Sequence, residues 1–265
     1  MREMRTMARR PRTDYDAIGH LYDTQPYRAR AADPDLLAFA RDREPADHAV
    51  LDIGCGTGNQ LIANRDALPG GFYAGLDRSL GMLRQGRLKT REIAWVRGDG
   101  ARLPFADDSF GFVSCQFAFH HIGDKAGMLR AVLRVLRPGG RFLLRNLCPQ
   151  ESGDWLYYEY FPEALLVDLR DFWPVDAIVG VMETAGFAAV AANFEHIRFE
   201  QDLPARLDTV RRRDTCSQLQ AISGAAYRDG VTRLERDIAD PSLARSRNDH
   251  LCLATIRGEA PNRNG

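Results

Sequence analysis

Short apolar runs alternate with segments of helical periodicity from about residue 48 onward. A short apolar run bounded by glycine or aspartate is typical of a buried strand. Seven such runs are found: AVLDIG (49–54), FYAGLD (72–77), IAWVRG (93–98), FGFVSCQFAF (110–119), RFLLRNL (141–147), AVAANFEHI (189–197) and HLCLATIR (250–257). Because strands and helices alternate, the pattern predicts an α/β fold with a mostly parallel sheet covered by helices.

The segment between the fourth and fifth runs is predicted to be a helix. Its apolar residues recur at helical spacing and are Met128, Leu129, Val132, Leu133 and Leu136. Asp124 is the expected N-cap, and PGG at 138–140 is the expected stop. DAIVGVMETAGF (176–187) predicts a further helix.

Two segments interrupt the alternation of strands and helices. Residues 148–174 are dense in aromatic side chains, and residues 198–249 are mostly helical in pattern. A connection of about fifty residues usually serves a function or forms a small subdomain. We therefore expect two helical insertions into one domain.

The turn after the first strand carries three glycines in LDIGCGTGNQ (51–60). Glycine lets a backbone adopt left-handed conformations and lets a ligand approach closely. A dinucleotide fingerprint needs Gly or Ala at position 59, where this chain has Asn59, and a P-loop needs a lysine that does not follow. The turn therefore indicates a polar ligand other than those of these two motifs.

Four motifs in register resemble those of the class I S-adenosylmethionine-dependent methyltransferases. They are the Asp52-x-Gly-x-Gly-x-Gly turn, Asp77 at the end of the second strand, Asp99 after the third, and FAFHHI followed by LRPGGRFLL around the last two parallel strands. The resemblance covers roughly residues 47–147 and is nearest to the ubiquinone and menaquinone methyltransferases. It implies a Rossmann-like sheet of seven strands with an antiparallel last strand and helices on both faces.

The resemblance also implies the cofactor S-adenosylmethionine, with S-adenosylhomocysteine as product. Asp77 is expected to accept hydrogen bonds from the ribose hydroxyls, and Asp99 to accept one from the adenine amine. Asp52 is expected to hold the ammonium group of the methionine part. The full set expected to bind the cofactor is Asp52, Gly54, Cys55, Gly56, Thr57, Gly58, Asp77, Arg78, Asp99, Gly100 and Gln116. The alternative for the acids is that they only cap helices or end turns.

Ligands of open α/β sheets bind beyond the carboxyl ends of the strands. Three lid segments, 13–30, 148–174 and 198–249, are expected to converge there around a small organic acceptor. The side chains expected to line its pocket are Tyr22, Trp155, Tyr157, Tyr158 and Phe161. His121, with His120 beside it, is the candidate general base. The alternatives are that the aromatic residues only pack the lid and that the two histidines are structural.

Composition narrows the possible partners. Lys+Arg and Asp+Glu both number 36, which argues against a dedicated nucleic-acid binder. No apolar run approaches the roughly eighteen residues of a membrane span. The five cysteines are scattered, which predicts reduced thiols in a cytoplasmic protein and no metal site. We expect one domain over residues 13–257 between disordered tails at 1–12 and 258–265.

Several alternatives stay open on the sequence alone. A nucleotide-dependent oxidoreductase and a non-catalytic protein that binds S-adenosylmethionine are the two rival functions. The acceptor is expected to be a secondary metabolite or a quinone- or phenol-like compound, and the protein a monomer or homodimer. Four arginines at 206 and 211–213 either hold an anionic group or lie on a solvated helix face.

Overall fold

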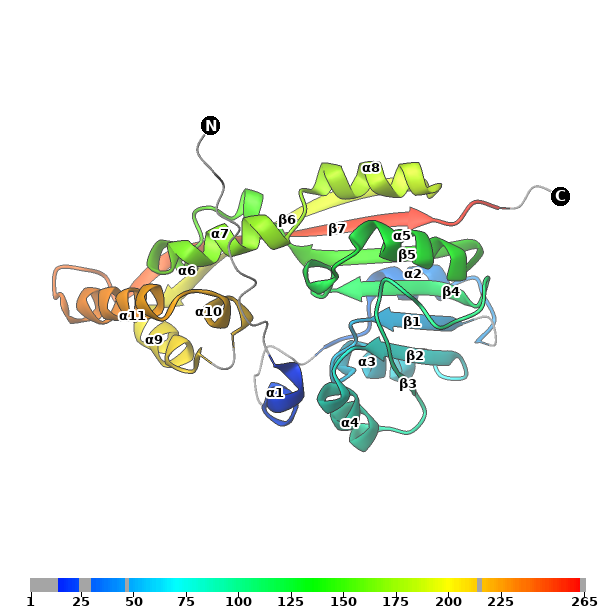
Figure 1. Ribbon diagram of the computed structural model, residues 1–265, viewed down its shortest axis with the longest axis horizontal. Helices are drawn as coiled ribbons and strands as arrows, with labels where there is room; N and C mark the ends of the chain where they lie inside the picture. Colours follow the sequence, from blue (N-terminus) through cyan, green and yellow to red (C-terminus); the bar gives the residue numbers. More distant parts are fainter. Residues whose placement is uncertain (1–13, 24–29, 46–47, 214–215, 263–265) are drawn as a thin grey trace.

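The computed structural model describes residues 14–23, 30–45, 48–213 and 216–262. Its centre is a seven-stranded sheet with the order β3-β2-β1-β4-β5-β7-β6 (Figure 1). The strands are β1 (Ala49–Ile53), β2 (Phe72–Asp77), β3 (Ala94–Arg97), β4 (Phe110–Gln116), β5 (Leu136–Leu147), β6 (Ala188–Asp202) and β7 (Ser246–Glu259). β7 pairs antiparallel with both β5 and β6, while the other neighbours pair in parallel. The predicted fold, with its antiparallel last strand, is confirmed.

Helices cover both faces of the sheet because side chains along each strand alternate between two cores. Val50 packs with residues of α2 (Pro34–Ala40) and α3 (Asn59–Ala67) on one face. Leu51 packs with residues of α5 (Lys125–Val135) and α8 (Val175–Ala185) on the other. α4 (Leu80–Lys89) lies near β2 and β3 (Figure 1).

Local sequence signals set the ends of several elements. The Asp124 carboxylate accepts from the Gly127 N–H at 2.7 Å, which confirms it as the N-cap of α5. The expected stop at 138–140 is wrong: α5 already ends at Val135, and these residues lie inside β5. β4 ends at Gln116 and not at residue 119, because Phe117 adopts a left-handed φ of 56° and a short 3₁₀ helix, η3 (Phe119–His121), follows.

The two insertions form one helical unit at the carboxyl ends of the parallel strands (Figure 1). Its helices are α6 (Leu156–Tyr160), α7 (Pro162–Asp171), α9 (Leu203–Arg211), α10 (Ser217–Ala221) and α11 (Gly224–Ala239). They enclose a hydrophobic cluster of their own. The second insertion emerges at this edge because β6 ends there and β7 begins there. It starts at residue 203 and not at 198, since β6 continues to Asp202.

The carboxyl end of the domain extends further than expected. β7 continues to Glu259, and the Ala260 N–H donates to the Gly140 carbonyl at 2.8 Å. Residues 258 and 259 therefore belong to the sheet, and Ala260 is hydrogen-bonded to it. Residues 1–12 and 263–265 of the two expected tails lie outside the described residues. Among the described helices, none combines the length and apolar character that crossing a membrane requires.

Candidate functional site

The glycine turn connects β1 to α3 and has left-handed backbone at each glycine. The φ angles are 72° at Gly54, 55° at Gly56 and 78° at Gly58. A Cβ at Gly54 would lie 2.2 Å from the Ala118 side chain, and one at Gly58 would lie 2.2 Å from the Trp95 ring. These two glycines are thus required by protein neighbours as well as by φ. A Cβ at Gly56 would meet only the Tyr22 ring, at 3.9 Å, so Gly56 leaves room for a ligand.

Asp77 points its carboxylate at this turn from the end of β2. The carboxylate accepts from the Gly56 N–H at 2.9 Å and from the Ser79 N–H at 2.8 Å. Burial raises the pKa of Asp77 above its ordinary value, although these backbone donors oppose the shift. The structure therefore joins the two motifs that the sequence separates by about twenty residues.

Two further buried carboxylates lie near the turn. Asp52 is 5% exposed and accepts from the Ser114 hydroxyl at 2.8 Å, and burial raises the pKa of Asp52 to about 7. Asp33 accepts from the Gln116 side-chain amide at 2.6 Å, and burial raises the pKa of Asp33 too. The negative charges of Asp33 and Asp77 contribute to the raised pKa of Asp52. A cation bound here would relieve this mutual repulsion.

Asp33 was not found from the sequence. It is the N-cap of α2, where its carboxylate accepts from the Asp35 and Leu36 N–H groups. The motif of an aspartate followed by a proline at the start of an apolar segment signals this cap. Nothing in the local sequence places Asp33 beside Gln116, which is 83 residues away.

The other predicted cofactor residues have mixed surroundings. The Asp99 side chain accepts from the Ala101 N–H at 3.0 Å, a local contact within the turn after β3, and its contact with the cofactor stays a prediction. Gly100 is buried, and a Cβ there would lie 2.9 Å from the Ile122 side chain. Cys55 is a buried free thiol, and the Thr57 hydroxyl donates to Asp23 at 2.6 Å. Arg78 is exposed.

Helix α1 (Tyr15–Tyr22) packs against α4 beside the glycine turn. It makes up most of the described part of the first lid segment, residues 14–23 and 30, since residues 13 and 24–29 lie outside the described residues. Tyr22 approaches Gly56 in the turn. Residue Tyr15, which the sequence did not single out as a site residue, has its hydroxyl 3.0 Å from Nε2 of His121.

His120 and His121 lie in η3 with their ring centroids 3.9 Å apart. The His120 ring stacks on Phe172 at 4.0 Å with an interplanar angle of 12°. Phe172 thus brings the insertion 148–174 to the histidine pair. The sequence indicated Phe172 only as one of the aromatic residues of this segment. The structure therefore places side chains from two predicted lid segments around His120 and His121.

The aromatic residues predicted for the acceptor pocket are packed inside the helical insertion. Tyr157, Tyr158 and Phe161 are 4%, 2% and 1% exposed, and Trp155 stacks on Tyr157 with ring centroids 4.8 Å apart. The Tyr158 hydroxyl donates to Asp168 at 2.8 Å. Packing accounts for the burial of these rings, and their contact with an acceptor stays a prediction.

The arginines at 206, 211 and 213 contact different partners. Arg206 lies 3.7 Å from the buried Asp249 carboxylate. Arg211 pairs with Glu235 at 2.8 Å, and the Arg213 guanidinium donates to two backbone carbonyls. These side chains hold the insertion together at separate places.

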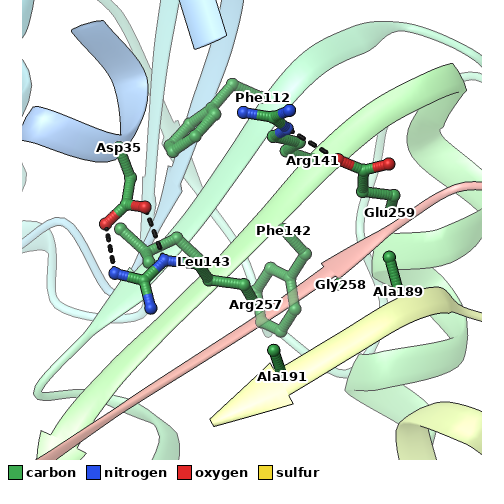
Figure 2. A pocket seen from close by; sticks show the side chains of 10 residues that line it. All are labelled: Asp35, Phe112, Arg141, Phe142, Leu143, Ala189, Ala191, Arg257, Gly258 and Glu259. Atoms are coloured by element: carbon green, nitrogen blue, oxygen red, sulfur yellow. Dashed lines mark hydrogen bonds and ion pairs between the residues drawn. The ribbon is translucent and has the colours of Figure 1, made fainter. Parts of the chain in front are cut away.

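A cavity of about 150 Å³ lies on the α2 side of the sheet, apart from the glycine turn and the two histidines (Figure 2). Arg257 forms two hydrogen bonds to Asp35, at 2.5 and 2.8 Å, and Arg141 pairs with Glu259 at 2.8 Å. The charges of this cavity are thus neutralised within the chain. None of the predicted site residues lines it.

Comparisons with known proteins agree on one family. Residues 51–144 match the model of a methyltransferase domain. The chain is 30% identical over 167 residues to a demethylmenaquinone methyltransferase of a Roseiflexus species, covering 55% of this chain and 70% of that protein. It is 36% identical over 171 residues to the same enzyme of Corynebacterium kroppenstedtii, covering 60% and 72%.

A solved structure shows the same fold. It is a protein of Anabaena variabilis, described as a methyltransferase from an antibiotic biosynthesis pathway. It superposes with a TM-score of 0.64 at 19% identity, over 83% of this chain and 95% of that chain.

Proposed function

This chain belongs to the class I S-adenosylmethionine-dependent methyltransferases, and we propose that its methyl acceptor is a quinone- or phenol-like small molecule. Membership of this family argues against the rival function considered from the sequence, a nucleotide-dependent oxidoreductase. The acceptor class draws on the relatives, which are named for demethylmenaquinone, and on the side chains around His121.

The residues around the glycine turn fit the cofactor. When bound, S-adenosylmethionine supplies a methyl group on a positively charged sulfur. Asp33 and Asp77 bring negative charge to the turn, a bound cation would favour the charged form of Asp52 as well, and Gly56 leaves room for a ligand. Asp77 would accept hydrogen bonds from the ribose hydroxyls, and Asp99 and Gly100 would bind the adenine. The other carboxylates near the turn would balance the positive charge of the cofactor's ammonium group.

A single observation carries the acceptor class: four rings gather at the carboxyl end of β4. They belong to Tyr15, His120, His121 and Phe172. A planar aromatic acceptor can stack among such rings, and an imidazole can remove the proton of a phenolic hydroxyl. The resulting phenolate is a much stronger nucleophile than the phenol. His121 is the proposed base because the hydroxyl of another residue already reaches its Nε2.

The remaining contribution of the chain is to position the acceptor and exclude water. Helix α1 closes one side of the site, and Phe172 closes another. A small planar molecule is therefore favoured over a macromolecule.

The test is a transfer assay with the purified full-length chain and S-adenosylmethionine. Reduced short-chain demethylmenaquinone and simple phenols serve as acceptors, and phosphoethanolamine serves as an acceptor without an aromatic ring. We expect S-adenosylhomocysteine to form and mass spectrometry to find one added methyl group on the aromatic acceptors only. Methylation of phosphoethanolamine and of no aromatic compound would refute the proposed class. Cofactor binding without transfer to any acceptor would favour a non-catalytic binding protein.

A further inference from the structure

We propose that Tyr15 is a positioning residue that keeps His121 in the tautomer able to take a proton, a role that rests on the proposed function of His121 as the base. The two residues are 106 positions apart, yet the Tyr15 hydroxyl lies 3.0 Å from Nε2 of His121. Their rings meet edge to face, with centroids 5.5 Å apart and an interplanar angle of 69°. The contact joins the lid helix α1 directly to the candidate base.

Helix α1 is fixed near both of its ends. At its start, the Asp16 carboxylate accepts from the Ser79 hydroxyl at 2.8 Å and from the Gly81 N–H at 2.6 Å. These groups lie at the start of α4, where a helix presents free N–H groups and the positive end of its dipole. The Gly81 N–H, with smaller contributions from neighbouring groups, lowers the pKa of Asp16, so this carboxylate stays charged at neutral pH.

Just beyond the end of α1, the Asp23 carboxylate contacts the start of α3. It accepts from the Thr57 hydroxyl at 2.6 Å and from the Asn59 side-chain amide at 2.9 Å. Lys89 pairs with the same carboxylate at 2.8 Å. The two ends of α1 are therefore attached to the two helices that follow the cofactor-binding strands.

Two glycines set how closely α1 approaches α4. A Cβ at Gly19 would lie 3.0 Å from the carbonyl carbon of Gly81. A Cβ at Gly81 would lie 2.4 Å from the carbonyl oxygen of Asp16. The two backbones are thus in contact, and a larger residue at either position must push α1 away. The distance from Tyr15 to His121 depends on this contact.

The direction of the hydrogen bond decides what His121 can do. A phenol hydroxyl is a stronger acid than the N–H of a neutral imidazole, so Tyr15 donates and Nε2 accepts. A neutral histidine whose Nε2 accepts carries its proton on Nδ1. Tyr15 therefore stabilises the tautomer with a lone pair on Nε2, the nitrogen that faces the lid.

An acceptor hydroxyl then takes the place of the Tyr15 hydroxyl at Nε2. Its proton moves to Nε2, which leaves His121 protonated on both nitrogens and the acceptor as a phenolate. The phenolate forms the bond to the methyl carbon through its oxygen or through a neighbouring ring carbon, and the electron pair of the breaking carbon–sulfur bond stays on sulfur. When the ring carbon is methylated, it then loses its hydrogen as a proton to water, and the oxygen regains a proton from water to restore the phenol. His121 afterwards returns its proton to water. The opposite tautomer, with Nε2 protonated, cannot take this proton.

The first test is nitrogen NMR of the full-length chain labelled at histidine, with no acceptor present. The chain has six histidines, and His121→Ala identifies the signals of His121. In the wild type we expect Nε2 of His121 to appear as a non-protonated nitrogen. Tyr15→Phe keeps the ring and removes the hydroxyl, so most of His121 should shift to the Nε2-protonated tautomer that imidazole prefers in water.

Two more variants separate the contact from general effects on the lid. Gly19→Ala should displace α1 and shift the His121 tautomer as Tyr15→Phe does. His20→Ala, an exposed position on the same helix, should leave the His121 signals unchanged. Unchanged His121 signals in Tyr15→Phe overturn the proposal. If Tyr15→Phe does not fold, as judged by circular dichroism, unchanged signals in Gly19→Ala overturn it instead.

The second test is turnover with reduced demethylmenaquinone as the probe. Tyr15→Phe should lower kcat about tenfold and leave the KM for S-adenosylmethionine within about twofold. A purely structural role would instead weaken cofactor binding along with kcat. If the wild type methylates no aromatic acceptor, the proposed acceptor fails while the NMR result still stands. If it methylates one and Tyr15→Phe matches it in kcat, only the role of Tyr15 fails.

Discussion

Replacing Asp52 with Asn should stabilise the protein at pH 8 much more than at pH 5. The Asp52 carboxyl is buried beside β4, where the Ser114 hydroxyl is its hydrogen-bond donor at 2.8 Å. Burial, reinforced by the charges of Asp33 and Asp77, raises the pKa of Asp52 to about 7. An Asn side chain has nearly the same shape and carries no charge at either pH.

The sign and size of the effect follow from proton linkage. In the unfolded chain an Asp titrates near ~3.9, so between about pH 4 and pH 7 the folded protein holds a proton that the unfolded chain has lost. The contribution of this group to the free energy of unfolding is therefore present at low pH and is lost as the pH rises through 7. Between pH 5 and pH 8 the loss amounts to roughly 2–3 kcal/mol.

The assay is urea unfolding of the wild type and Asp52→Asn at both pH values. The gain in unfolding free energy from the substitution should be larger at pH 8 than at pH 5 by about 2–3 kcal/mol. Asp42→Asn removes an exposed carboxylate and serves as the control for a general effect of charge. If the gain from Asp52→Asn is the same at both pH values, Asp52 does not hold a proton in the folded state and the reasoning fails.

Three further substitutions test the cofactor site, the base and the turn. Asp77→Ala should weaken S-adenosylmethionine binding by about one to two decades, since a charge-assisted hydrogen bond contributes roughly 1.5–3 kcal/mol; calorimetry showing wild-type affinity would contradict its role. His121→Ala should lower turnover by roughly 10²–10⁴ with cofactor affinity unchanged, and full activity would exclude it as the base. Gly58→Ala should destabilise the fold by about 1–3 kcal/mol, because φ is 78° and a Cβ would overlap Trp95. Gly180→Ala, where a Cβ meets open space in α8, is its control in thermal unfolding and should be neutral or stabilising.

The sequence by itself determined the order of the seven strands along the chain, the helices α5 and α8, and the place of the glycine turn. These features depend on short-range patterns: apolar runs for the strands, a helical repeat with Asp124 before it for α5, and three alternating glycines for the turn. The edge at which the second insertion emerges followed from the family resemblance, because a hairpin of the last two strands, which pair antiparallel, places their connection at the carboxyl end of β6. Strand ends were less well predicted, since pairing with a neighbour lengthened β6 and a left-handed Phe117 shortened β4.

Tertiary structure alone decided which side chains meet. Asp33 reaches Gln116 across 83 residues, and Tyr15 reaches His121 across 106. The sequence also did not show what Tyr157, Tyr158 and Phe161 contact, and the structure buries these three rings in the core of the insertion. The physical reason is that apolar periodicity records only how buried a position is, while the partner of a side chain depends on how distant segments pack. Tyr15 reaches His121 because Gly19 and Gly81, which have no Cβ, let α1 pack closely against α4.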